Sequence, residues 1–364
     1  MSTLTRDDVW AKLQQAALVE GGLPAHGEAR SPWFVRVMLG FAGWIGALFL
    51  LGFVVVGLAF VVKSSTVSYL VGAGACAAAA AIFRANRNGD FTSQFVLAVS
   101  LAGQALMAYG MSQWFQRSMS GVALALAAQQ ALLFILLPNF VHRVWAAWSG
   151  AYMLCFAMAD MGLNPFAPAV VTAGFIAVWL REFEHAGRGE LLRAGGYGLA
   201  LAAVQTAVMH GGIWYGWIAS WGARHATGSQ AMAWAGAIAA GAVLIVAVLL
   251  LLRREGVALA SGPGKTALAA AAVLALATLK APGVGPAAAI LVVGYANGNR
   301  VLAGLGIAAL VGYLSHYYYA LHATLLEKSA LMACAGIALL ITRLALHRWW
   351  PAQGNMKSRE ANHA

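Results

Sequence analysis

The side chains best placed to do chemistry are concentrated in residues 313–328. They are, in chain order, Tyr313, His316, Tyr317, Tyr319, His322, Glu327 and Lys328. Tyr313, His316 and Tyr317 are spaced i, i+3 and i+4, which puts them on one face of a helix. Tyrosines at a lipid interface form an aromatic belt. The histidines and the neighbouring acid and base instead predict a hydrogen-bonding cluster that binds a partner or a ligand.

Two tryptophans in another connecting segment would add to the same surface. Trp214 and Trp217 lie between two long apolar runs, in a segment that also contains Trp221. Tryptophan is enriched where a helix leaves the bilayer, so anchoring in the lipid interface is one interpretation. A surface for a ligand or a protein partner is the other.

Four glutamines stand in the middle of apolar runs, where polar side chains are costly and usually have a role. Gln104 lies in one run, Gln129 and Gln130 lie in the next, and Gln205 lies in a later one. Hydrogen bonding between helices is one interpretation, and the lining of a substrate path is the other. None of the twelve acidic residues lies in the middle of an apolar run, and Asp160 at the end of one comes closest. This pattern disfavours a transporter driven by protons or sodium ions.

The candidate motifs for catalysis and cofactor binding each lack a residue that the motif requires. Residues 262–266 read Gly-Pro-Gly-Lys-Thr, but a phosphate-binding loop needs a glycine at position 259, which is leucine. The cysteines, Cys76, Cys155 and Cys334, fall in three different apolar runs, and none has a histidine or second cysteine at metal-ligand spacing. We therefore expect no catalytic residues, no metal, no cofactor and no enzymatic activity.

The elements that position these residues follow from composition. Of 364 residues, 61% are hydrophobic and 10% are charged, and the mean hydropathy is +0.74. Soluble domains carry about 25% charged residues, so a soluble protein is excluded. Runs such as residues 244–252 are apolar on every face, which favours helices over the alternating pattern of a membrane β-barrel. The sequence predicts an all-α, polytopic transmembrane helix bundle.

The apolar runs predict about twelve membrane spans, since a helix needs about 20 mostly apolar residues to cross a bilayer. The ninth and tenth are short and flank the sequence Ala-Pro-Gly-Val-Gly-Pro at 281–286, so a re-entrant pair that leaves ten spans is the alternative. The predicted spans are residues 35–62, 67–83, 93–114, 121–137, 144–159, 165–180, 191–209, 230–252, 265–279, 285–296, 301–320 and 329–346.

The basic residues predict the orientation, because cytoplasmic loops carry an excess of lysine and arginine. With the N-terminus inside, 18 of the 23 fall in cytoplasmic segments and 5 in outer loops, so both termini are expected in the cytoplasm. The predicted organisation is a cytoplasmic segment at 1–32 with a short amphipathic helix, a bundle at 33–347 and a basic tail at 348–364. The net charge of +11 is spread over these segments, which indicates contact with membrane lipids and no nucleic acid.

Two stretches of the sequence resemble a known family. Residues 31–53 read SPWFVRVMLGFAGWIGALFLLGF, and residues 298–340 include YYYALHATLLEKS. They are similar to the two ends of a bacterial inner-membrane family defined as a domain of unknown function. Its genes commonly neighbour one for a small membrane-anchored protein with a GDYxxLxY motif. The resemblance covers nearly the whole chain. It implies a multi-pass protein of the bacterial inner membrane with that small protein as a partner, and it implies no reaction.

Two functions fit these patterns. The first is a non-enzymatic component of an envelope complex that binds the small membrane-anchored partner on its periplasmic face, around residues 316–328 and 214–221. The second is a permease or flippase for an apolar or zwitterionic small molecule or lipid, with Gln104, Gln129 and Gln130 lining its path. Short spans interrupted by glycine and proline often mark transport sites, which favours the second reading for residues 265–296.

Overall fold

The computed structural model describes most of the chain in separate stretches. These are residues 6–16, 63–85, 90–115, 118–182, 186–210, 230–279 and 283–320, together with residues 21, 22, 38, 41, 42, 45, 46, 49, 52, 281, 326 and 329. The chain divides into two compact units, Met1–Trp114 and Phe115–Ala364.

The first unit contains a short N-terminal helix and a helical hairpin. A helix, α1 (Arg6–Gln15), lies in the N-terminal segment where the amphipathic helix is predicted, and it ends before the glycines at 21 and 22. The hairpin consists of α3 (Ser65–Ala85) and α4 (Asp90–Trp114). Its backbones are in close contact, since a Cβ added at Gly103 would lie 2.6 Å from the carbonyl oxygen of Gly72. Small residues allow this approach where lipid gives no hydrophobic drive for association.

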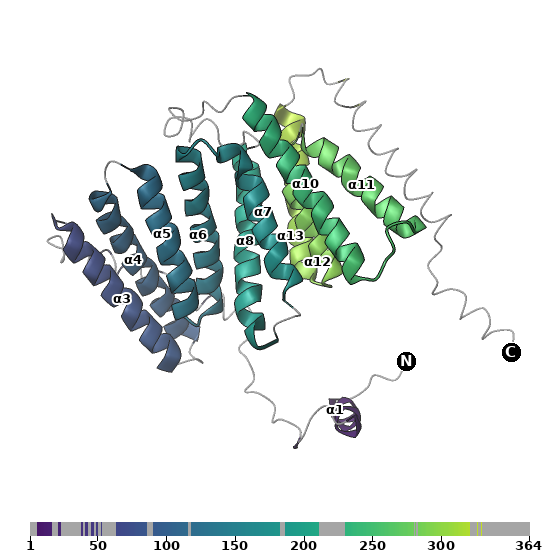
Figure 1. The fold of residues 1–364 in the computed structure, drawn as a ribbon. Helices are drawn as coiled ribbons and strands as arrows, with labels where there is room; N and C mark the ends of the chain where they lie inside the picture. Colours follow the sequence, from purple (N-terminus) through teal and green to yellow (C-terminus); the bar gives the residue numbers. More distant parts are fainter. Residues whose placement is uncertain are drawn as a thin grey trace. The chain divides into compact units, whose positions relative to one another are not determined.

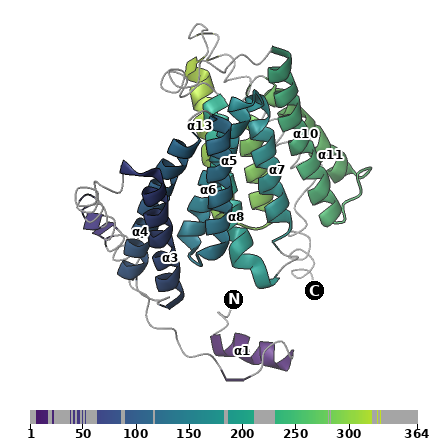
Figure 2. The same cartoon turned by 60° about the vertical axis from the view of Figure 1, so that its left-hand side comes forward.

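The second unit is a bundle of helices that lie side by side (Figures 1 and 2). Their sequence is interrupted by two short 3₁₀ turns, η2 (Asn164–Phe166) and η3 (Ala186–Arg188). The helices are α5 (Met119–Leu136), α6 (Phe140–Asp160), α7 (Ala167–Leu180), α8 (Gly189–His210), α10 (Gln230–Arg254), α11 (Gly262–Thr278), α12 (Val284–Ala296) and α13 (Arg300–Ala320).

Side-chain caps determine where several of these helices begin. The Ser118 hydroxyl accepts from the amide of Gly121, the Asn139 side chain accepts from the amide of His142, and Ser261 caps α11 in the same way. Each cap satisfies one of the amides that a helix N-terminus leaves without a partner. Helix α6 therefore begins at Phe140, four residues before the predicted Val144.

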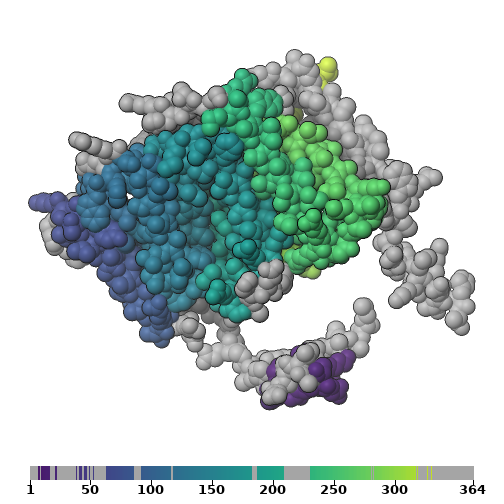
Figure 3. Space-filling view, in the orientation of Figure 1, coloured from purple at the N-terminus to yellow at the C-terminus, as the bar shows by residue number. Residues whose placement is uncertain are grey.

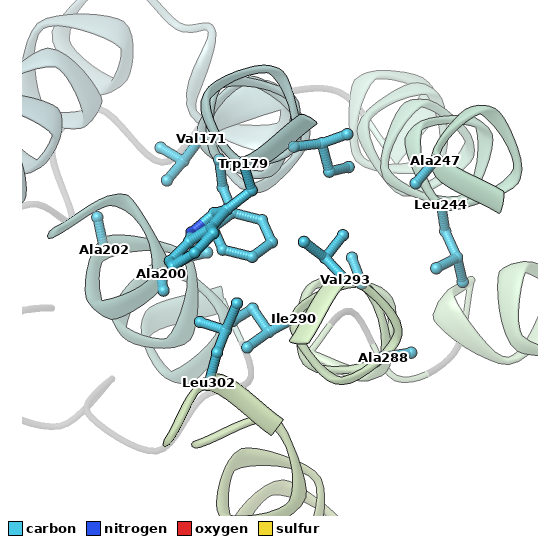
Figure 4. Close-up of a cluster of buried hydrophobic side chains, with 14 of the residues drawn as sticks. Val171, Trp179, Ala200, Ala202, Leu244, Ala247, Ala288, Ile290, Val293 and Leu302 are labelled. Carbon is cyan, nitrogen blue, oxygen red and sulfur yellow. The ribbon is translucent and has the colours of Figure 1, made fainter. Parts of the chain in front are cut away.

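The centre of the second unit is formed by its shortest α-helix. Nine of the 13 residues of α12 are buried, and the helix contacts α7, α8, α10, α11 and α13. In Figure 4, Ile290 and Val293 of α12 point toward Trp179 of α7, and Leu302 of α13 lies beside them. The space-filling view shows side chains occupying the spaces between neighbouring helices from α6 to α11 (Figure 3).

The all-α prediction is confirmed for the described residues, which contain eleven α-helices and no strand. Four helices are long and apolar enough to cross a membrane, and they cover Ser65–Ala85, Thr92–Trp114, Met119–Leu136 and Gln230–Arg254. Four more helical segments are apolar but shorter, at Asn164–Leu180, Gly262–Thr278, Val284–Ala296 and Arg300–His316. The count of about twelve spans and the cytoplasmic placement of both termini stay predictions. The first and last predicted spans lie largely outside the described residues.

Candidate functional site

The end of α13 holds the described part of the predicted tyrosine and histidine cluster. Tyr313 is only 5% exposed, and it packs with Ala281 and Val284. Its ring lies directly against Gly283, where an added Cβ would overlap it. The ring is thus seated against the turn between α11 and α12. His316, one turn further along α13, is half-buried.

The rest of this predicted cluster is outside the side chains that the structure describes. Residues 317 and 319 lie in α13 by their backbone alone. His322, Glu327, Lys328, Trp214 and Trp217 are outside the described residues altogether. The structure therefore places Tyr313 and His316 together at one end of α13 and leaves the other members of the cluster as predictions.

The first predicted glutamine belongs to a small polar group in the hairpin of the first unit. The Gln104 side chain is buried, and its amide donates to the Ser100 hydroxyl at 3.4 Å. The carbonyl oxygen of Ser100 accepts from the Cys76 thiol at 3.5 Å. The bond from Cys76 links α3 to α4, whereas the bond from Gln104 to Ser100 lies within α4, so hydrogen bonding of Gln104 between helices stays a prediction. Gln104 lies in a different unit from Gln129 and Gln130, so the structure describes no path through all three.

Gln129 and Gln130 are both buried, on α5 in the second unit. Gly150 of α6 packs against the Cβ of Gln130, since an added Cβ there would lie 3.1 Å from it. Within the described part of the chain, neither amide atom of Gln129 has a hydrogen-bond partner. A buried amide without partners costs about 1–3 kcal/mol, so this side chain is suited to bind something that enters the bundle.

A polar cluster that the sequence did not indicate joins α7, α8 and α10 to the turn between α12 and α13. Asn297 accepts from the Arg254 guanidinium at 2.8 Å and donates to the carbonyl oxygen of Trp179 at 3.3 Å. Asn299 exchanges hydrogen bonds with the Tyr197 hydroxyl at 2.8 and 3.1 Å and caps α13 by accepting from the amide of Leu302. We call residues Trp179, Tyr197, Arg254, Asn297 and Asn299 the asparagine cluster.

Aromatic packing holds the same region together. The rings of Trp179 and Tyr197 meet edge to face at 5.3 Å between centroids. Gly196 lies so close to the Trp179 indole that an added Cβ would overlap it. The asparagine cluster thus ties the ends of α7, α10 and α12 to the start of α13 and to the first half of α8.

With the exception of Asp160, the described charges of the second unit are gathered at this end of the bundle. Here α6, α8, α11 and α13 begin and α5, α7, α10 and α12 end. An ion pair of 3.1 Å joins Arg193 to Glu182, whose side chain is 7% exposed. The acidic residues at this end are Glu182, Glu190 and Glu255, and Asp160 lies at the other end of α6, where it accepts from the amide of Ser120. The basic residues are Arg143, Arg181, Arg188, Arg193, Arg253, Arg254, Lys265 and Arg300.

One feature of the sequence points to the asparagine cluster. The sequence Asn-Gly-Asn-Arg at 297–300 places two amides and a cation in a turn between apolar runs. The partners in α7, α8 and α10 are 43 to 118 residues away in the sequence, so no local spacing predicts them. Within the described residues, no group of three or more His, Cys, Asp or Glu side chains is arranged to hold a metal ion.

These features define an α-helical protein whose apolar helices include four of membrane-spanning length, and whose larger unit has its described arginines and lysine at one end. The chain belongs to the family of DUF4401, a domain of unknown function, which matches residues 32–349. No curated protein and no solved structure matches it.

Proposed function

We propose that this chain is a multi-pass protein of the bacterial inner membrane, with both termini in the cytoplasm. It acts as a non-enzymatic component of an envelope complex. Its partner is a small membrane-anchored protein, of the kind that carries a GDYxxLxY motif, and the partner binds on the periplasmic face at the end of α13.

The orientation rests on the basic end of the second unit. Arginine and lysine are retained on the cytoplasmic side during insertion, so the end with Arg254 and Arg300 is the cytoplasmic one. His316 lies 16 residues beyond Arg300 on α13, about 24 Å along the helix at 1.5 Å per residue. That separation is close to the thickness of the hydrocarbon core, about 30 Å, and it puts His316 near the periplasmic surface.

The observation that carries the partner site is the seating of Tyr313 against Gly283. A ring fixed in a turn between two other helices holds the end of α13 in one position. The half-buried His316 one turn later is then presented on a rigid element, which is the arrangement that a binding site needs. Interfacial anchoring of the tyrosines alone does not require this fit.

Co-purification tests the proposal. The double change His316→Gln with His322→Gln keeps hydrogen-bonding capacity and removes the ability to become charged. A charge-assisted contact is worth about 1.5–3 kcal/mol, so the yield of the tagged GDYxxLxY protein should fall about tenfold or more.

The control is Ser315→Ala, which alters an exposed side chain on the same turn of α13 and should leave capture unchanged. Glu327→Gln tests the same surface from its acidic side and should weaken capture. Normal yields of the partner for both the histidine and the glutamate variants would contradict the binding site and leave these residues as lipid-interface anchors.

Transport is a second candidate, and the buried amide of Gln129 favours it. A flippase for zwitterionic lipid is tested in proteoliposomes with fluorescent phosphatidylcholine, whose outer-leaflet fraction is bleached with dithionite. Gln129→Leu with Gln130→Leu should abolish transfer between leaflets and leave the protein folded. The control Leu132→Ala changes a side chain of α5 that is 57% exposed and should transfer lipid normally. If the two variants transfer lipid between leaflets at equal rates, Gln129 and Gln130 do not line a transport path.

A further inference from the structure

The end of α10 and the turn between α12 and α13 form a surface that the function proposed above does not use. Arg253 and Arg254 end α10, and Arg300 begins α13. All three side chains are exposed. Glu255 is the acidic neighbour, so three arginines against one glutamate leave a local charge of +2.

The guanidinium of Arg254 is oriented before any ligand arrives. One of its nitrogens donates to Asn297 at 2.8 Å, and Asn297 is itself held by its bond to the backbone of Trp179. Arg300 follows Asn297 by three residues, so their Cα atoms are at most about 11 Å apart. Arginine recognises phosphate oxygens in a bidentate manner, so two exposed arginines on the neighbouring ends of α10 and α13 are suited to share one phosphate group.

The apolar residues beside these arginines indicate the kind of phosphate. Tyr295, on the last turn of α12, is 84% exposed, and Val301, next to Arg300, is 69% exposed. Leu250, one turn before Arg254 on α10, is 40% exposed. An exposed tyrosine at the level of the arginines is typical of the lipid headgroup region. The aliphatic side chains lie further toward the interior of the membrane, where they can contact acyl chains. A free inorganic anion has no apolar part and would gain nothing from contact with these exposed apolar side chains.

We infer that Arg254 and Arg300 bind the phosphate of an anionic phospholipid, in the leaflet that adjoins the basic end of the bundle. Tyr295 lies at the depth of the headgroup, and Val301 and Leu250 contact the start of the acyl chains. Basic surfaces between transmembrane helices are used for such recognition. The asparagine cluster supplies the rigidity, because it fixes one of the two arginines relative to the turn that carries the other.

The test uses the purified full chain in a non-ionic detergent. Dioleoyl phosphatidylglycerol should raise the unfolding temperature and should appear as a bound adduct in native mass spectrometry, whereas dioleoyl phosphatidylcholine should do neither. Arg254→Gln with Arg300→Gln should raise the phosphatidylglycerol concentration needed for half of the effect about tenfold, as expected for the loss of a charge-assisted contact.

The matched control is Arg181→Gln with Arg188→Gln, which removes two charges from the same end of the bundle, next to α7 and α8. It should bind phosphatidylglycerol as the unchanged protein does. An equal loss in both double variants would show diffuse attraction to charge and overturn the site. The same stabilisation by inorganic phosphate, or by phosphatidylcholine, would overturn the choice of ligand.

Arg254→Gln also removes the bond to Asn297, and this variant alone could fail to fold. Arg300→Gln alone keeps the inference testable, because its side chain is exposed and its loss leaves the asparagine cluster intact. It should weaken the binding of phosphatidylglycerol at least several-fold. Unchanged binding by a folded Arg300→Gln protein would refute the site without any bearing on the periplasmic partner.

Discussion

Replacing Gly306 with alanine tests the packing of α12 against α13. An added Cβ at Gly306 would lie 2.6 Å from the amide nitrogen of Leu291, about 0.8 Å short of the 3.4 Å at which ordinary contact begins. The obstacle is backbone, so no side-chain rotation relieves it and the two helices must separate. Overpacking of this kind costs about 1–3 kcal/mol. For a unit of this size that corresponds to a fall in Tm of roughly 2–12 °C.

The matched control is Gly304→Ala on the same helix. Nothing lies within 4 Å of an added Cβ there, so this change should leave Tm unchanged or raise it slightly, because alanine is favoured over glycine in a helix by about 1 kcal/mol. Thermal unfolding of both variants in the same detergent gives the comparison. If Gly306→Ala and Gly304→Ala unfold at the same temperature, the close contact between α12 and α13 is wrong.

Three further outcomes are expected. Reporter fusions within residues 181–193 should show cytoplasmic activity and fusions within 220–229 periplasmic activity, and the reverse pattern would contradict the use of the basic end to orient the chain. Tyr197→Phe removes both hydrogen bonds to Asn299 and should cost about 1 kcal/mol in thermal unfolding, whereas no loss would mean that this pair adds nothing to stability. Gln129→Leu should unfold no earlier than the unchanged protein, because a buried amide without partners is replaced by an apolar group of similar size. A clear drop in Tm would reveal a partner for that amide.

The helices could be predicted because hydrophobicity along the chain decides where they lie. The run predicted at 230–252 is α10, Gln230–Arg254, and the run at 285–296 is α12, Val284–Ala296. In each case polar residues end the run and the helix ends with it. The predicted start at Val144 is four residues after the start of α6. Val144 begins the apolar run, whereas the helix begins at the residue that follows its Asn139 cap.

The contacts between helices could not be predicted in the same way. Tyr313 was assigned to an open cluster from its spacing to His316, and its burial depends on Gly283, which is 30 residues earlier. The asparagine cluster depends in the same way on Trp179 and Arg254, which reach Asn297 only because three helices end at one level. Spacing along one helix specifies which residues share a face, and it carries no information about which other helix that face meets.

The shortness of α12 has a consequence for how the protein enters the membrane. Its 13 residues extend about 20 Å, too little for the hydrocarbon core of about 30 Å. Nine of them are covered by other helices. A segment this short is poorly suited to independent insertion, so its placement depends on the helices that cover it, including α13, whose backbone it touches at Gly294 and Gly306. On the proposed membrane topology, α12 is therefore expected to insert together with its neighbouring helices and not as a separate span.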